Sequence, residues 1–246
     1  MAEPVAAGAL LAAQLAALWW FLKGDLASWR VFQRLGNTGD RQRRYWRWTV
    51  KPWLAFALPA LAGLLLLGRG AALWQAPAEF GPAAALLPRI EGEALRTMLA
   101  SAGLGLAIGT VLIVVVSRLR RKPAATLGDI GAILPRNRAE LLPAALLSVT
   151  AGVTEEVAFR LWLPLLLVLL TGNAVLAFAA ATLLFGALHA YQGWAGVLAT
   201  TALGGVLAAV YLVTGLLWLV VALHVLIDLN GLVLRPLLLG AGRTSS

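Results

Sequence analysis

One long apolar stretch, residues 141–170, carries three full charges, Glu155, Glu156 and Arg160, near its middle. A helix needs about 20 apolar residues to cross the hydrocarbon core of a bilayer, so this stretch exceeds one perpendicular crossing. A charged side chain at bilayer depth costs at least ~2.5–3.5 kcal/mol on insertion scales and marks a functional site by default. The stretch therefore predicts a functional membrane helix, tilted or broken near Gly152 or Pro164.

Composition places the rest of the chain in the same environment. Hydrophobic residues make up 61% of the 246 residues, charged residues make up 13%, and the mean hydropathy is +0.84. These values are typical of polytopic membrane proteins rather than soluble globular domains, so one integral-membrane domain is expected. The absence of cysteine excludes disulfides, a thiol nucleophile and cysteine metal sites.

The basic residues predict the orientation of the chain. The net charge is +9, and 14 of the 20 Lys and Arg residues lie in two segments, residues 23–51 and 117–140, which border apolar spans. This pattern is typical of cytoplasmic loops. It also makes a nucleic-acid partner unnecessary, because no stacking or phosphate-binding motif accompanies the charges. We expect the N-terminus outside and the C-terminus, with Arg235 and Arg243, in the cytoplasm.

The apolar segments predict an all-α fold, a polytopic transmembrane bundle of about seven to eight membrane helices. The spans that we expect are residues 4–22, 52–68, 94–116, 141–170, 174–191, 195–213 and 216–239. Turns are expected at residues 171–173, 192–194 and 214–215. Glycines in the third and sixth spans (Gly103, Gly105, Gly109, Gly196, Gly204 and Gly205) predict close contact with neighbouring helices.

Six ionisable residues of the later spans are the candidate site residues: Glu155, Glu156, Arg160, His189, His224 and Asp228. Residues four apart share a helix face, so Glu156 can pair with Arg160 and His224 with Asp228. Glu155 projects about 100° away from Glu156. One carboxylate is therefore available for chemistry, although a purely structural buried ion network is the alternative.

This set suits the activation of water. A carboxylate in a low-dielectric site can act as a general base, and a neutral imidazole can share its water or polarise a carbonyl group. Two histidines and a glutamate (Glu155, His189 and His224) could equally hold a catalytic zinc ion with an open position for water. The residues alone leave metal-bound and metal-free water activation open.

Three motifs carry a family resemblance: Glu155-Glu156-x-x-x-Arg160, Phe185-x-x-x-His189 and His224-x-x-x-Asp228. They resemble the motifs of the CPBP family, which comprises the type II CAAX prenyl endopeptidases and Abi-like, glutamic-type intramembrane proteases. The resemblance covers residues 140–228. It suggests a division into N-terminal transmembrane helices with basic cytoplasmic loops, residues 1–138, and a catalytic membrane core, residues 139–240.

The resemblance also implies roles. Glu155 would activate the hydrolytic water together with His189, while Glu156 and Arg160 support that carboxylate. His224 and Asp228 would stabilise the oxyanion, or His224 would join a metal. The last motif often ends in Asn, and an ionised carboxylate cannot donate a hydrogen bond. We therefore expect Asp228 to orient His224.

The predicted function is an intramembrane endopeptidase of a bacterial inner membrane that cleaves a membrane-anchored or lipidated protein. A non-enzymatic immunity or partner-stabilising protein with the same fold is the alternative. A proton-coupled transporter is disfavoured, because the two halves of the chain show no paired broken helices.

Overall fold

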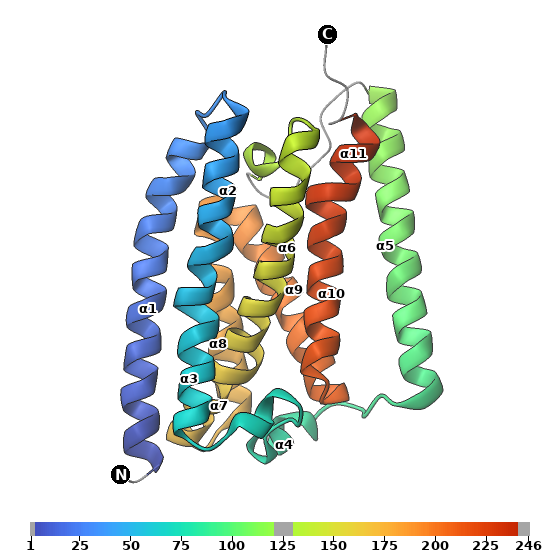
Figure 1. Ribbon diagram of the computed structural model, residues 1–246. Coiled ribbons are helices and arrows are strands. Elements are labelled where there is room, and N and C mark those ends of the chain that lie inside the picture. Colours follow the sequence, from blue (N-terminus) through green and yellow to red (C-terminus); the bar gives the residue numbers. More distant parts are fainter. Residues whose placement is uncertain (1–2, 121–129, 241–246) are drawn as a thin grey trace.

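The computed structural model describes residues 3–120 and 130–240, and within these ranges the protein is a helical bundle without strands (Figure 1). The predicted fold class is thus confirmed. The α-helices are α1 (Glu3–Phe32), α2 (Thr38–Pro52), α3 (Leu58–Leu66), α4 (Gly81–Ala84), α5 (Gly92–Arg120), α6 (Leu141–Glu156), α7 (Leu163–Thr171), α8 (Ala174–Leu188), α9 (Gly193–Thr214), α10 (Leu217–Leu229) and α11 (Arg235–Leu239). Short 3₁₀ turns lie at Gly70–Leu73, Ala78–Phe80, Gly131–Ile133, Arg138–Glu140 and Ala190–Gln192.

Five helices of the described residues are long and apolar enough to cross a membrane, which makes this an integral membrane protein. They are Glu3–Phe32, Thr38–Leu66, Gly92–Arg120, Ala190–Thr214 and Leu217–Leu239, and Ala174–Leu188 is a shorter apolar helix. The continuous helix of residues 141–171, which contains the three charges, is not among the five. Fewer helices therefore meet these criteria than the seven to eight expected.

The first basic segment, residues 23–51, is mostly helical and not a loop. The helix α1 continues to Phe32 and α2 begins at Thr38, so most of residues 23–51 extend the two helices beyond the expected spans. Asn37 starts α2 by accepting hydrogen bonds from Gly39 N and Asp40 N. The α1–α2 turn and the C-terminal end of α5 lie at the same end of the bundle (Figure 1). Arg121, Lys122 and Arg243 of the predicted cytoplasmic regions lie outside the described residues.

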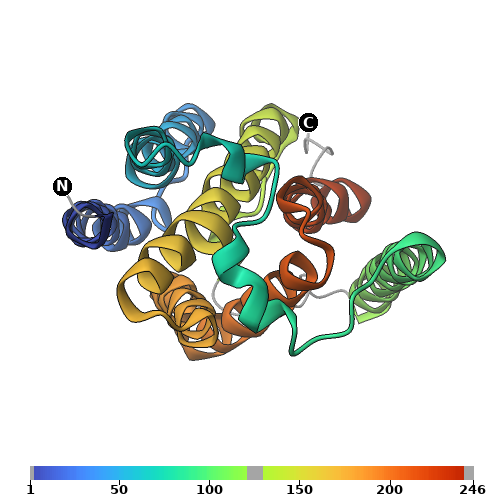
Figure 2. The same ribbon diagram turned by 90° about the horizontal axis from the view of Figure 1, so that it is seen from below.

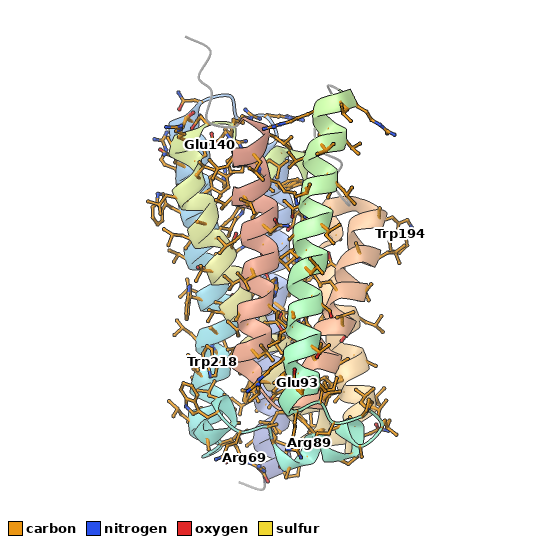
Figure 3. The ribbon with its side chains drawn as sticks, turned by 90° about the vertical axis from the view of Figure 1, so that its right-hand side faces the viewer. Arg69, Arg89, Glu93, Glu140, Trp194 and Trp218 are labelled. Carbon is orange, nitrogen blue, oxygen red and sulfur yellow. The ribbon has the colours of Figure 1, made fainter. Side chains whose placement is uncertain are left out.

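Ion pairs tie the chain together at both ends of the bundle. At the end with the α1–α2 turn, Nε of Arg41 and Oε1 of Glu140 form a buried ion pair of 2.9 Å. At the other end, Arg69 binds Glu3 at 2.8 Å and Glu79 at 2.7 Å. Figure 3 shows Glu140 at one end of the molecule and Arg69 at the opposite end. Hydrogen bonding to Glu3 raises the pKa of Arg69 above its usual value.

Three helices widen into π-helical turns, at Trp53–Ala57, Val157–Trp162 and Asn230–Leu234. Each π turn ends two residues before a proline, namely Pro59, Pro164 and Pro236. A proline has no N–H to donate, and its ring clashes with the carbonyl group four residues earlier. The wider turn accommodates this clash without breaking the helix. The expected disturbance near Pro164 is therefore a π turn directly after Glu156.

Turns end the helices where the sequence predicts. Gly172 ends α7 with a φ of 67°, and the Asn173 side chain begins α8 by accepting a hydrogen bond from Leu176 N. Gly215 ends α9 with a φ of 70°. Glycine adopts these positive angles without steric cost. The short connections keep α7, α8, α9 and α10 adjacent, which brings distant motifs together.

The predicted glycine contacts hold in one span and fail in the other. Gly204 in α9 lies against the Phe185 ring, where a Cβ atom would approach the ring to 2.8 Å. In α5, a Cβ atom on Gly103, Gly105 or Gly109 would meet nothing within 4 Å. Figure 2 shows α5 standing apart at the edge of the bundle. Its described hydrogen bonds to the bundle include Thr110 Oγ1 to Asn230 Oδ1 at 2.7 Å.

Candidate active site

The centre of the candidate site is Glu156, the last residue of α6. Its Oε1 atom lies 2.6 Å from Nδ1 of His224 on α10, and its Oε2 atom lies 3.0 Å from Nε of Arg160. All three side chains are almost fully buried. The contact with Arg160 is an ion pair rather than an aligned hydrogen bond, since neither atom has a hydrogen-bond partner among the described residues. Glu156 thus connects the first and third motifs.

The Glu156 contact fixes which side of His224 is available. An ionised carboxylate can only accept hydrogen bonds, so Nδ1 of His224 carries the proton in this contact. The other ring nitrogen, Nε2, lies 3.9 Å from Oε2 of Glu155 and 3.8 Å from Oδ2 of Asp228. These distances are too long for direct hydrogen bonds but suit a bridging polar atom. Glu156, rather than Asp228, therefore makes the hydrogen bond that orients His224.

Glu155 differs from its neighbour in surroundings. Its side chain is 13% exposed, whereas that of Glu156 is fully buried. Glu155 lines a cavity of about 1010 Å³, together with His189, His224 and Asp228. The expected divergence of the two carboxylates is therefore present. Glu156 is engaged by Arg160 and His224, and Glu155 faces the cavity.

His189 reaches the same cavity from the end of α8. Its Nδ1 atom lies 2.8 Å from the carbonyl oxygen of Phe185, which can only accept, so Nδ1 donates this hydrogen bond. Nε2 is then the unprotonated nitrogen of a neutral ring and can accept a hydrogen bond. The ring also packs 5.8 Å from that of Tyr191, which lines the cavity too.

Phe185 packs its ring against three side chains of this site. Its ring lies 4.5 Å from the Arg160 guanidinium carbon, 4.8 Å from the His189 ring and 6.2 Å from the His224 ring. The first contact is a cation–π interaction. Gly204 leaves room for Phe185, and its carbonyl oxygen accepts a hydrogen bond of 3.4 Å from Arg160 Nη2. The Phe185-x-x-x-His189 spacing was a signal for this role, although Phe185 alone suggests only packing.

The N-terminal helices supply one wall of the cavity. Phe21, Asp25 and Trp29 of α1 line it, as do Trp48 and Pro52 of α2. None of these residues belongs to the three motifs. Sequence analysis missed their contribution, because Asp25 and the aromatic residues look like parts of a membrane-surface segment. The buried carboxylate of Asp25 was the available signal, since a membrane-facing helix has no structural need for it.

The predicted zinc set does not fit the observed geometry. Within residues 3–120 and 130–240, no three His, Cys, Asp or Glu side chains form a group that could hold a metal ion. Glu155, His189 and His224 share the cavity but are not arranged as a set of ligands.

The fold and site define a polytopic membrane protein with a buried carboxylate–imidazole–guanidinium cluster that opens into a large cavity. Residues 137–230 match the family model described as Rce1-like, type II CAAX prenyl endopeptidase Rce1-like. The match supports the resemblance to the CPBP/CAAX family of intramembrane proteases that the motifs indicated, and the matched segment includes all six candidate site residues. Neither the curated proteins nor the solved structures contain a match to the chain.

Proposed function

We propose that this protein is an endopeptidase that cleaves a membrane-anchored or lipidated protein with water activated by Glu155 and His189. The observation that carries the proposal is that the two glutamates have different surroundings. Glu156 is held by Arg160 and His224, which leaves Glu155 as the carboxylate that faces the cavity. A purely structural ion network would leave no reason for a second, unpaired carboxylate there.

In this mechanism Glu155 takes one proton from water, and the water oxygen attacks the carbonyl carbon of the scissile peptide bond. Nε2 of His189 accepts a hydrogen bond from the remaining water proton. The C–N bond then breaks, and Glu155 returns its proton to the leaving nitrogen, which departs as an amine. The other product ends in a carboxylic acid, which gives its proton to the released amine, so the products are a carboxylate and an ammonium group and one water molecule is consumed.

His224 would stabilise the oxyanion. For this role it carries protons on both ring nitrogens, with Nδ1–H bound to Glu156 and Nε2–H directed toward the reacting oxygen. Arg160 and His224 would then balance the charges of Glu155 and Glu156. Asp228 lies 3.8 Å from Nε2 and would help to keep the ring in this position. Arg160 acts through Glu156 and is a positioning residue.

The arrangement of charges supports an orientation in the membrane. We propose that the end of the bundle with the α1–α2 turn faces the cytoplasm of a bacterial inner membrane, and that the N-terminus lies outside. Residues 1–138 would then form the membrane helices that complete the cavity, while residues 139–240 form the catalytic core. The cavity lining from α1 and α2 supports this division of roles.

The test compares the membrane proteomes of cells that carry the wild type or Glu155→Gln. We expect at least one membrane-anchored protein to remain uncut in the variant, while the abundance and membrane insertion of the protein itself are unchanged. Glu93→Gln is the matched control, because Glu93 is exposed and lies at the start of α5. An identical set of protein termini in wild type and Glu155→Gln would contradict the proposal and favour a non-enzymatic partner-stabilising role.

A further inference from the structure

Arg235, the first residue of α11, is a charged cavity residue without a counter-charge. The Nε atom of its side chain is buried and has no hydrogen-bond partner, and the side chain forms no ion pair within residues 3–120 and 130–240. The fully buried arginines of the described residues do have counter-charges, since Arg41 pairs with Glu140 and Arg160 pairs with Glu156. A partly buried guanidinium is costly without a partner, so the binding of an anion would offset this cost.

The position of Arg235 suits contact with a molecule that also reaches the candidate site. Both Arg235 and Asp228 line the cavity of about 1010 Å³. They are seven residues apart on one continuous helix, with the π turn Asn230–Leu234 between them, and both contribute to the cavity lining. At no more than about 1.5 Å per residue, their separation along the helix axis is up to about 10 Å. An extended peptide covers this distance with about three residues.

Two other arginines add positive charge to this part of the cavity. Arg118 donates a hydrogen bond of 2.6 Å to the carbonyl oxygen of Leu238, which lies in α11. Arg136 donates one of 2.8 Å to the carbonyl oxygen of Leu35. Both residues line the cavity, and neither forms an ion pair with a described carboxylate. Carbonyl oxygens satisfy their donors without neutralising their charge, so the two arginines offset the carboxylates of Asp25, Glu155 and Asp228, which also line the cavity, and add to the attraction of Arg235 for an anion.

From these observations we infer that Arg235 binds a carboxylate of the peptide substrate and thereby selects which peptide bond lies against Glu155. The inference rests on the proposed proteolytic function and adds a specificity-determining residue to it. Arginine is suited to this task, because its planar guanidinium group can bind a carboxylate through two parallel hydrogen bonds. The carboxylate belongs either to the free end of a chain or to an acidic side chain.

A binding experiment tests this inference without requiring cleavage. The protein carrying Glu155→Gln is placed in phosphatidylcholine nanodiscs and titrated with dansyl-labelled, N-dodecanoyl hexapeptides of neutral residues. One peptide ends in a free carboxylate, the second in a carboxamide, and the third in a carboxamide with an aspartate at the third residue from its end. We expect the peptide with the free carboxylate, the one with the aspartate, or both to bind at least tenfold more tightly than the neutral amide.

The preference must depend on Arg235. We expect Arg235→Gln to bind all three peptides with the affinity of the neutral amide, and Arg235→Lys to retain part of the preference. Arg120→Gln is the matched control, because it removes the same charge near the same end of the bundle from an exposed residue that does not line the cavity. It should keep the full preference. Thermal unfolding of each variant shows that the fold is retained.

Three results would overturn the inference: equal affinity for all three peptides, no binding of any of them, or a preference that survives Arg235→Gln. If the three peptides bind equally and phosphatidylglycerol in the nanodisc displaces them, Arg235 binds a lipid phosphate. This result would also overturn the inference. The proposed function is tested separately. If the carboxylate preference depends on Arg235 but the wild type cleaves no protein, the inference about Arg235 stands and the proposed protease function is wrong.

Discussion

Glu156 and His224 are joined by a contact of 2.6 Å between Oε1 and Nδ1, although 68 positions separate them in the chain. The contact links the end of α6 to the middle of α10. It orients the imidazole so that Nε2 faces Glu155 and Asp228. Because Arg160 holds the other oxygen of Glu156, the ring position depends on an ion pair that does not itself line the cavity.

The first prediction concerns this ion pair. Arg160→Met leaves Glu156 charged and buried without its partner, and breaking a buried pair in this way costs about 3–5 kcal/mol. Glu156→Gln together with Arg160→Met removes both charges and should restore much of the lost stability. Thermal unfolding in detergent measures the wild type, both single variants (Arg160→Met and Glu156→Gln) and the double variant. Additive losses in the double variant would contradict a coupled pair.

The second prediction separates chemistry from stability at Glu155. Glu155→Gln removes the proposed general base but keeps the volume of the side chain, so the rate of peptide cleavage should fall by about 10²–10⁴-fold. The unfolding temperature should change little, because Glu155 faces the cavity and is not part of the Arg160 ion pair. Single-turnover cleavage of the protein identified by membrane proteomics provides the rate. Undiminished cleavage would remove Glu155 from the mechanism.

The sequence predicted those parts of the site that depend on helix periodicity. The spacing of four residues predicted the pairing of Glu156 with Arg160. The angle of about 100° between consecutive residues of a helix predicted that Glu155 would point away from this pair. The motif order predicted that His189 and His224 would approach the glutamates, and both histidines line the cavity with Glu155. Local geometry sufficed for the first two relations, because each lies within one helix, whereas the approach of the histidines to the glutamates was predicted from the family resemblance.

Other features depend on which helices meet, and periodicity carries no such information. The hydrogen bond of His224 to Glu156 rather than to Asp228 is set by the packing of α10 against α6. The glycines of α5 look like those of α9, yet only Gly204 has a close neighbour on another helix. The π turn after Glu156 could have been read from Pro164, because the missing N–H has a fixed local effect.

The third prediction tests the space that Gly204 leaves for Phe185. In Gly204→Ala the new Cβ atom would lie 2.8 Å from the Phe185 ring, so the ring must shift away from α9. Overpacking of this kind costs about 1–3 kcal/mol, and the shift would also disturb Arg160 and His189, which contact that ring. We therefore expect lower stability and lower activity together.

The neighbouring glycine provides the control for this change. In Gly205→Ala the nearest atom to the new Cβ would be Thr182 Cγ2 at 4.0 Å, an ordinary contact. This variant should keep both the activity and the unfolding temperature of the wild type. If Gly204→Ala and Gly205→Ala behaved alike, the approach of α9 to Phe185 would not be a constraint on the site.

The fourth prediction concerns Arg41, whose side chain ties α2 to the segment before α6. It is fully buried and pairs with Glu140 at 2.9 Å, and its terminal nitrogens donate to the carbonyl oxygens of Ala132 and Leu134. Arg41→Met would leave Glu140 without its counter-charge and the two carbonyl oxygens without the Arg41 donor. The loss of one partner from a buried pair costs about 3–5 kcal/mol, so the unfolding temperature should drop markedly.

Arg43→Met is the matched control for this prediction. Arg43 is exposed and pairs with Asp40 on the same helix, so its replacement should change stability by at most about 1 kcal/mol. Because α2 and the end of α1 line the cavity, Arg41→Met should also weaken peptide binding in the Glu155→Gln background. Unfolding curves and titrations of the labelled hexapeptides measure the two effects. Equal stability of Arg41→Met and Arg43→Met would mean that the buried pair does not hold the N-terminal helices against the core.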